Sequence, residues 1–566
     1  MQTATRSRSL PRLRLSIALI AGAVGSMAAQ AQSFDFNNGG NFNAPFMPGM
    51  LVVSRSVYDN LSSNVQVGQV LPPNCASTTA GCSTGNGAIA DGTYPYVFNN
   101  DTYDSSFGIT SRIFLDQMTP SGLPVSTLEV PNSLQNSHGH APADQLVTSF
   151  SSKSELGLHL STDGKYLTFF GYVAPVNTID ASNANTPGVV DPTNPDNQAI
   201  YRAVARVDRA GNFTFTETNA YSGNNGRAAI LNDSNGNNLI YGTGNGGNGA
   251  NPQPEGVVVG TGAQLITASS QHEAQQTPGT LEPVGSFSIT QLGDKADKIG
   301  KDDNFRGIAL YNNVLYYTKG SGSNGVNTVY FLDTTGKACP TGVGVPAKNA
   351  TLPTTPLAYN AATVATTGLP SNMCILAGFP STPVKTATTV AYPFGMWFAD
   401  ANTLYVADEG DGYAGGTDLY THAAAQTTAG LQKWVFNTTT QKWTLAYTLQ
   451  AGLELGTAYT VRGYPTGSNS VTNLPWAPAT DGLRNITGRV DDDGTVTIWG
   501  ITSTVSGNGD LGADPNRLVA IRDVVKNTSA TSASHEKFVT LRSANFGEVL
   551  RGVSFAPGTA SNGHLF

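Results

Sequence analysis

The sequence predicts an all-β fold: a single β-propeller of four-stranded antiparallel blades, with six blades favoured and seven as the alternative. Three observations predict it. The composition is rich in Gly, at 63 of 566 residues, and low in charged residues, at 12%. Such a composition is typical of short strands joined by polar turns. A hairpin-like unit also recurs along the chain, and the two ends of the chain hold complementary parts of that unit.

The first thirty-one residues have the order of a secretory signal. Four arginines precede an apolar run, Leu15 to Met27, and Ala29-Gln30-Ala31 follows it. We expect residues 1–31 to be a signal peptide cleaved after about Ala31. Residues 32–48 are then a flexible segment and residues 49–566 the propeller domain.

The rest of the chain has no stretch of about 20 apolar residues that could span a membrane. The sequence therefore predicts a secreted or periplasmic protein, and we expect it to be a monomer. The formal net charge is −8, and it becomes −12 when the predicted signal leaves with its four arginines and no acid. This acidic excess argues against nucleic acid as the partner, because binding to phosphates requires Lys and Arg.

The stretch DDNFRGIALYNNVLYYTKG, residues 302–320, is the clearest copy of the repeat. Each copy has a small residue, an alternating apolar segment, a turn rich in Asn, Asp or Gly, and usually a second apolar segment, a pattern typical of hairpins. Six copies align, at Leu156, Arg227, Arg306, Phe394, Arg484 and Arg551.

A second strand-turn-strand unit follows the first, as in AVARVDRAGNFTFTE and LQKWVFNTTTQKWTLAY. Two hairpins per period make a four-stranded blade. The last copy, at Arg551, has a single clear strand, whereas the region from Met50 has three strands and lacks the first. One blade assembled from both termini would complete the ring, which a pair of β-sandwich domains, the structural alternative, would not predict.

The four cysteines form two pairs that are close in sequence, Cys75 with Cys82 and Cys339 with Cys374. In an exported protein this spacing predicts two local disulfides.

The segments Leu158 to Tyr172 and Val204 to Asn212, with the patterns LxLSTDGKYLxxxGY and VARVDxAGN, resemble those of secreted bacterial β-propeller proteins. The resemblance covers nearly all of the mature chain and concerns architecture. It implies a range of activities, from lactonases, phytases and glycan lyases to pure binding scaffolds, because one fold hosts many functions.

In a propeller, the loop that enters each innermost strand and the loop that joins strands two and three open on the same face. This geometry makes four carboxylates candidate catalytic groups: Glu155, Asp303, Asp481 and Glu548. His138 and His140 precede the first full repeat, where an imidazole could act as a general base. Solvated loops or strand caps would explain these residues equally well.

Candidate ligand-binding residues lie at the same mouth. Arg227, Arg306, Arg484 and Arg551 share one repeat position, so they either bridge to neighbouring blades or attract an anionic ligand. Asn225 and Asn304 lie in entering loops. Trp476, in a Pro-rich loop, could stack on a sugar.

Oxygen-rich turns predict a site for Ca²⁺ or another divalent metal, with Asp408, Glu409, Asp411 and Asp510 as ligands. An ordinary acidic turn is the alternative. Phosphate-cradling GxxxxGK[ST] loops and His-Glu-x-x-His helices are absent, so we expect no nucleotide cofactor. We interpret the chain as an exported propeller that binds a small molecule, a carbohydrate or a partner protein on its loop-rich face. A metal-dependent hydrolase, lactonase or lyase at the channel mouth is the alternative.

Overall fold

A computed structural model gives the fold. Its contacts divide the chain into two units, Met1–Phe42 and Asn43–Phe566. The structure describes residues 45–59, 61, 63–67, 108–135, 145–187, 198–245, 263–269, 304–320, 326–355, 373–382, 390–469, 472–508 and 511–560. All of these belong to the second unit, and the predicted signal peptide lies outside them.

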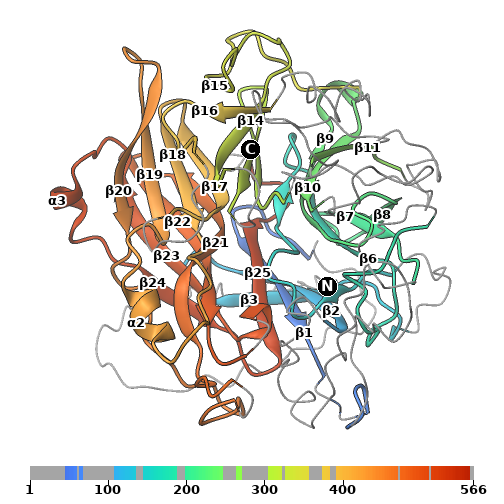
Figure 1. Cartoon of the computed structure of the whole chain (residues 1–566). Helices are drawn as coiled ribbons and strands as arrows, with labels where there is room; N and C mark the ends of the chain where they lie inside the picture. The colour runs from blue at the N-terminus through green and yellow to red at the C-terminus, as the bar shows by residue number, and fades with distance from the viewer. Residues whose placement is uncertain are drawn as a thin grey trace, which may run out of the picture. The chain divides into compact units, whose positions relative to one another are not determined.

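The two ends of the second unit share one blade, as the partial repeats predict. Blade 1 has the order β25 (Glu548–Phe555), β1 (Leu51–Val57), β2 (Thr110–Met118) and β3 (Pro124–Glu129), and the short β4 (Thr148–Ser149) also pairs with β2. In Figure 1 the red β25 lies beside the blue β1, and their antiparallel register runs from Leu51↔Phe555 to Val57↔Glu548. The ring is therefore closed by hydrogen bonds between the first and last strands.

Five further sheets follow in chain order, each antiparallel from its innermost strand outward. Blade 2 contains β5 (His159–Leu160), β6 (Tyr166–Tyr172), β7 (Arg202–Asp208) and β8 (Phe213–Thr218). Blade 3 contains β9 (Gly226–Asn232), β10 (Leu239–Gly244) and β11 (Ala263–Thr267). Blade 4 contains β12 (Ile308–Tyr311), β13 (Val314–Lys319), β14 (Thr328–Leu332) and β16 (Met373–Leu376), with β15 (Val343–Gly344) parallel to β16.

Blades 5 and 6 are four-stranded. Blade 5 contains β17 (Pro393–Asp400), β18 (Thr403–Asp408), β19 (Gly430–Asn437) and β20 (Lys442–Leu449), and blade 6 contains β21 (Ala479–Val490), β22 (Thr495–Val505), β23 (Arg517–Val524) and β24 (Val539–Ser543). The helices are short: η1 (Ser234–Gly236), α2 (Leu419–Ala424), η2 (Leu511–Ala513) and α3 (Ala530–Ala533). No helix in the described part of the chain is long and apolar enough to cross a membrane.

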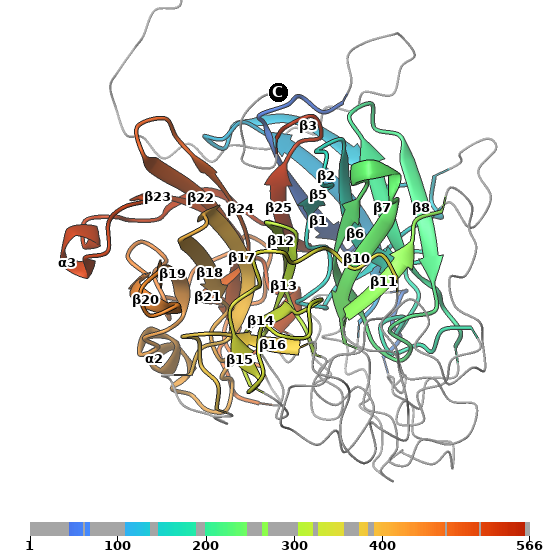
Figure 2. The ribbon, with the colours of Figure 1, turned by 90° about the horizontal axis from the view of Figure 1, so that it is seen from above.

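The innermost strands form a closed ring, in which β5 contacts β9, β9 contacts β12, β12 contacts β17, β17 contacts β21, β21 contacts β25, and β25 contacts β5. Figure 2 shows the sheets following one another around this ring. Six sheets account for all the described strands, so the six-blade prediction is confirmed over the seven-blade alternative.

Apolar side chains fill the spaces between blades. One cluster joins Tyr405 and Leu431 of blade 5 to Leu483, Val496 and Val519 of blade 6. A single blade cannot bury both of its faces, so each sheet is stabilised by its neighbours. The core is consequently distributed around the ring, and the polar loops are left at the ends of the strands.

Residues 302–320, the clearest copy of the repeat, show how the sequence of the repeat produces a hairpin. β12 and β13 pair from Ile308↔Tyr317 to Tyr311↔Val314, and Asn312 and Asn313 form the turn between them. Both Asn residues have positive φ, 47° and 59°. A two-residue hairpin turn requires this conformation, which Asn tolerates better than most residues.

Cys339 and Cys374 form the predicted disulfide, with Cα atoms 5.8 Å apart. It ties the segment after β14 to β16 within blade 4. A disulfide is consistent with an oxidising compartment. Cys75 and Cys82 lie outside the described residues.

Candidate functional site

A cavity of about 630 Å³ opens at one end of the ring. The loops that enter β5, β9, β12 and β21 contribute to its wall, and so do the loops that follow β6, β10, β18 and β22. These are the two classes of loop that the propeller geometry places on one face. The polar loops of five blades therefore meet at a single concave site.

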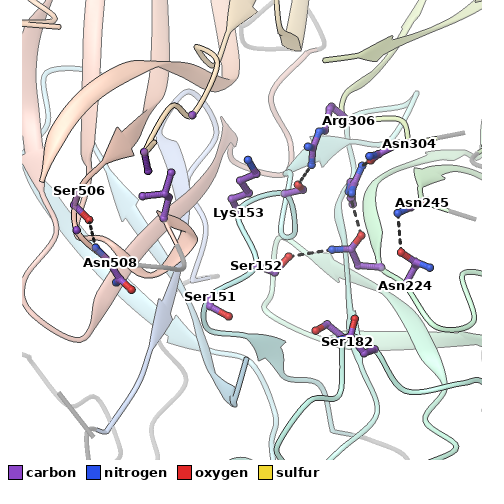
Figure 3. A pocket seen from close by; sticks show the side chains of 18 of the residues that line it. Ser151, Ser152, Lys153, Ser182, Asn224, Asn245, Asn304, Arg306, Ser506 and Asn508 are labelled. Carbon is purple, nitrogen blue, oxygen red and sulfur yellow. Dashed lines mark hydrogen bonds between the residues drawn. The ribbon is translucent and has the colours of Figure 1, made fainter. Parts of the chain in front are cut away.

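The wall of the cavity is polar and carries positive charge. Serine and asparagine side chains predominate, and Figure 3 shows Lys153 between Ser506 and Asn508 on one side and Asn304 and Arg306 on the other. Three cations line the cavity, Lys153, Arg227 and Arg306, and no Asp or Glu is among the described residues of the wall.

Arg227 lies at the start of β9 and is 5% exposed. Its Nη1 donates to Asn304 Oδ1 and, at 2.8 Å, to the Phe305 carbonyl, while its Nε donates to Asn225 Oδ1 at 3.1 Å. Arg227 thus joins blade 3 to the segment that enters blade 4 through neutral acceptors. Burial and the nearby charge of Arg306 hold the pKa of Arg227 well below its usual value.

Arg306 and Arg484 share one carboxylate. Glu409, which follows β18, lies with Oε1 3.7 Å from Arg306 Nε and Oε2 3.2 Å from Arg484 Nε. All three side chains are at least 94% buried. Burial alone would raise the pKa of Glu409, but the charges of Lys153, Arg306 and Arg484 outweigh burial and lower it.

The fourth arginine of the repeat, Arg551, donates to the carbonyls of Phe150 and Ser152 and lies 3.3 Å from Ser56 Oγ. All four arginines therefore contact a segment of an adjacent blade. Of the four, only Arg227 and Arg306 line the cavity. The sequence left bridging and anion binding as alternatives, and the contacts show that bridging does not depend on a ligand.

Of the carboxylates proposed for catalysis, the three that the structure describes each have different hydrogen-bond or ion-pair partners. Glu155 accepts hydrogen bonds from Tyr172 OH, Thr148 Oγ1 and the Ser149 amide. Glu548 lies 2.7 Å from Arg55 Nη1 in blade 1. Asp481 accepts from the Gly412 amide at 2.9 Å and from Gln426 Nε2. None of the three lines the cavity, and their catalytic role stays a prediction.

The acidic turns proposed as a metal site form local hydrogen bonds. Asp408 accepts from the amides of Tyr392 and Gly410, and Asp411 Oδ2 lies 2.6 Å from His422 Nε2. Burial raises the pKa of Asp408 and of Asp481 to about 7. In the described part of the chain, the one group of three potential ligand atoms within 4.8 Å of each other is Asp333, Cys339 and Cys374, and both cysteines are in the disulfide.

Several predicted residues lie outside the described ranges: His138, His140, Asp303 and Asp510. Trp476 is described and is 5% exposed, packed with Tyr464 in a small apolar cluster. The indole ring of Trp476 is therefore part of the packing that stabilises the loop entering β21.

Sequence reasoning missed Lys153 and Arg202. Lys153 lies two residues before Glu155 in an entering loop, so the same positional argument could have found it. Arg202 in β7 is fully buried and donates to the carbonyls of Ala184 and Asn224, which supports two loops of the cavity wall. No motif distinguishes this arginine from other strand residues.

No family model and no curated protein matches the chain. Solved structures do match, at low identity. A protein of Bacteroides uniformis, provisionally classed as a 6-phosphogluconolactonase, is 9% identical over 79% of this chain and 81% of that one, with a TM-score of 0.30. The GH74 enzyme of Niastella koreensis is 12% identical over 87% of this chain and 60% of that one, with a TM-score of 0.27. A PL25 ulvan lyase is 10% identical over 81% of this chain and 95% of that one, with a TM-score of 0.30. At these values the comparisons assign no activity to the chain.

Proposed function

We propose that this protein is an exported β-propeller that binds a small polyhydroxylated ligand, of the carbohydrate class, in the channel-mouth cavity. The observation that carries the proposal is the polar lining of a 630 Å³ cavity assembled from the loops of five blades. Serine hydroxyls and asparagine amides both donate and accept hydrogen bonds, as the hydroxyl groups of a sugar do. Predominantly apolar pockets are the rule for other small ligands.

The size of the cavity favours a small molecule over a partner protein. Ligand pockets usually measure about 300 to 1,000 Å³, whereas a stable protein interface buries roughly 800 Å² on each partner. The cavity lies within the first range. Binding of a partner protein, which the sequence also allowed, has no comparable support.

Catalysis by a metal-dependent hydrolase, lactonase or lyase stays a prediction. Glu155, Asp481 and Glu548 are each held by hydrogen bonds or an ion pair within the protein and lie outside the cavity lining. Binding without turnover therefore accounts for the described residues with fewer assumptions.

The test is ligand binding with a blocked cavity. Thr472 is exposed at the cavity wall, so Thr472→Trp should fill the mouth without disturbing the core. Thr439→Trp, in the exposed turn between β19 and β20, is the matched control. We expect an oligosaccharide found by glycan-array screening to bind the parent and the control equally in calorimetry, and the Thr472 variant at least about tenfold more weakly. Equal binding by both variants, or no binding to the parent, would refute the proposal.

A further inference from the structure

A buried lysine of blade 5 lies against a buried aspartate of blade 6. Lys433 Nζ is 3.0 Å from Asp523 Oδ2, and both side chains are fully buried. Tyr405, Lys433 and Tyr447 lie opposite one another on β18, β19 and β20, so their side chains share one face of blade 5. All three bond to Asp523 of β23. An amine nitrogen and a carboxyl group are therefore held in direct contact between the two blades.

A second carboxyl group, that of Glu536, lies beside Asp523. Glu536 follows α3 in the segment that joins β23 to β24, and its side chain is within hydrogen-bonding distance of the Asp523 carboxyl. Burial and the charge of Asp523 raise the pKa of Glu536 to about 8. In the described part of the chain, Glu536 Oε2 is buried and has no hydrogen-bond partner. Since two adjacent carboxylates cannot both remain ionised, Glu536 is a protonated acid at neutral pH and donates to Asp523.

The two carboxyl oxygens of Asp523 have different partners. Oδ1 accepts from the Val524 amide at 2.6 Å and from the Tyr447 hydroxyl at 2.7 Å. Oδ2 accepts from the Tyr405 hydroxyl and contacts Lys433 Nζ. Burial, together with the nearby Asp523, raises the pKa of both phenols, so their hydroxyls keep the protons that they donate. Two fixed donors at Oδ1 are the arrangement that stabilises an oxyanion when a nucleophile adds to a carboxyl carbon.

Lys433 is positioned as that nucleophile. Its Nζ also donates to the Val524 carbonyl at 2.7 Å and to the Tyr447 hydroxyl at 3.1 Å, which fixes its place beside Asp523. Burial lowers the pKa of Lys433 against the opposing charge of Asp523. Transfer of one proton from the ammonium to the carboxylate gives a neutral amine and a neutral acid, the forms that burial favours. A neutral amine has the lone pair that attack requires.

We propose that Lys433 and Asp523 join after folding through an amide bond between Nζ and Cγ, with Glu536 transferring the protons. One proton passes from the ammonium to Oδ2, the Nζ lone pair forms the N–C bond, and Oδ1 carries the charge of the tetrahedral intermediate. Glu536 then gives its proton to Oδ2 and takes one from Nζ, while the Cγ–Oδ2 bond breaks. An ammonium and a carboxylate thus yield one amide and one water, with no oxidant or other co-reactant, and Glu536 ends as it began.

Fixed contact favours this condensation, because well-oriented groups in one molecule react with effective concentrations of about 10⁵ to 10⁸ M. The bond would tie β19 of blade 5 to β23 of blade 6, in addition to the apolar packing between these blades. It is independent of the proposed ligand site, so either proposal can fail without the other.

Peptide mass spectrometry of the parent protein tests the bond directly. Trypsin does not cleave after an amide-bonded lysine, so a digest of the denatured and reduced protein should contain a branched peptide in which uncleaved Lys433 carries residues 523–526. This peptide should be lighter than its two linear parts together by one water molecule. A digest in which trypsin cleaves after Lys433 and residues 523–526 are released as a linear peptide, with no branched product, would overturn the proposal and leave a buried ion pair only.

Variants then assign the roles. Lys433→Met keeps the aliphatic stem and removes the nucleophile, so the branched peptide should be absent. Glu536→Gln keeps the shape of the side chain but cannot transfer a proton, so bond formation in freshly synthesised protein should slow about 100-fold or more. Glu454→Gln, which changes an exposed acid before β21, is the matched control and should form the bond as the parent does. An equal rate in Glu536→Gln and the control would overturn the role of Glu536, and the digest of the parent decides the bond itself whether or not a variant folds.

Discussion

Glu409 provides the sharpest test of the electrostatics of the ring. It is the only carboxylate in salt-bridge contact with either Arg306 or Arg484 among the described residues. Glu409→Gln keeps the shape of the side chain and removes its charge. The two buried guanidiniums would then face an amide that can donate as well as accept, and three cations would lose their common counter-ion.

The magnitude follows from burial. Removing one partner of a buried ion pair costs about 3 to 5 kcal/mol, because the remaining charge stays desolvated. The unfolding entropy is about 2.1 cal/mol/K per residue, or roughly 1.1 kcal/mol/K for a unit of some 520 residues, so the expected fall in Tm is about 3 to 5 °C. The pKa of Glu409 is lowered, so its stabilisation is present above the unfolded-state pKa and is lost as the pH falls through the folded-state pKa. The variant should differ most from the parent near neutral pH.

Differential scanning calorimetry at pH 7 measures the effect, with Glu548→Gln as the control. Glu548 is 17% exposed, and its partner Arg55 keeps a second carboxylate, Asp116, at 2.6 Å. A partly exposed pair of this kind contributes about 0 to 1 kcal/mol. Equal shifts for both variants, or an unchanged Tm for Glu409→Gln, would show that the shared carboxylate does not stabilise the ring.

Three further predictions concern closure, cross-linking and pH. Truncation before Glu548 removes β25, which pairs with β1 and contacts the neighbouring inner strands. The truncated chain should lose cooperative melting, because its ring is open. An unchanged melting curve would contradict closure of the ring by the two ends of the chain. Cys339→Ser with Cys374→Ser should lower the free energy of unfolding by about 2 to 4 kcal/mol in denaturant titrations, and no loss under oxidising conditions would argue against the disulfide. Burial raises the pKa of Asp481 to about 7, so the folded protein keeps a proton that the unfolded chain releases near pH 4. The free energy of unfolding should therefore fall by up to about 1.4 kcal/mol per pH unit as the pH rises from 4 to 7. Asp481→Asn should make the slope shallower without removing it, because the pKa of Asp408 is also raised to about 7. An identical slope would refute the assignment.

The blades were predictable because their determinants are local. Alternating apolar residues and Asn-rich turns specify each hairpin, as Asn312 and Asn313 do between β12 and β13. Closure was also predictable, because one missing strand at the N-terminus and one isolated strand at the C-terminus can complete only a common sheet. Repetition made each weak local pattern more informative.

The site was predictable only in position. The loops that enter β5, β9, β12 and β21 line the cavity as expected, whereas those that enter β17 and β25 contribute no residue to it. The partners of their side chains were not foreseeable, because they come from distant segments: Glu409 of blade 5 contacts Arg306, which precedes β12 of blade 4, and Arg484 of blade 6. Trp476 illustrates the same difficulty, since its burial against Tyr464 depends on how a Pro-rich loop folds back.

The arginines at the shared repeat position have different hydrogen-bond and ion-pair partners in different blades. At Arg551 the guanidinium is occupied by main-chain carbonyls, and at Arg484 it contacts Glu409. Blade 5 has Phe394 at the aligned position and contributes Glu409 instead, so the acid and the bases lie on different blades. Arg227 is left with neutral acceptors, and Arg306 shares an acid that also serves Arg484. The guanidinium that recurs at one position of the repeat therefore has a different set of partners in each blade that carries it.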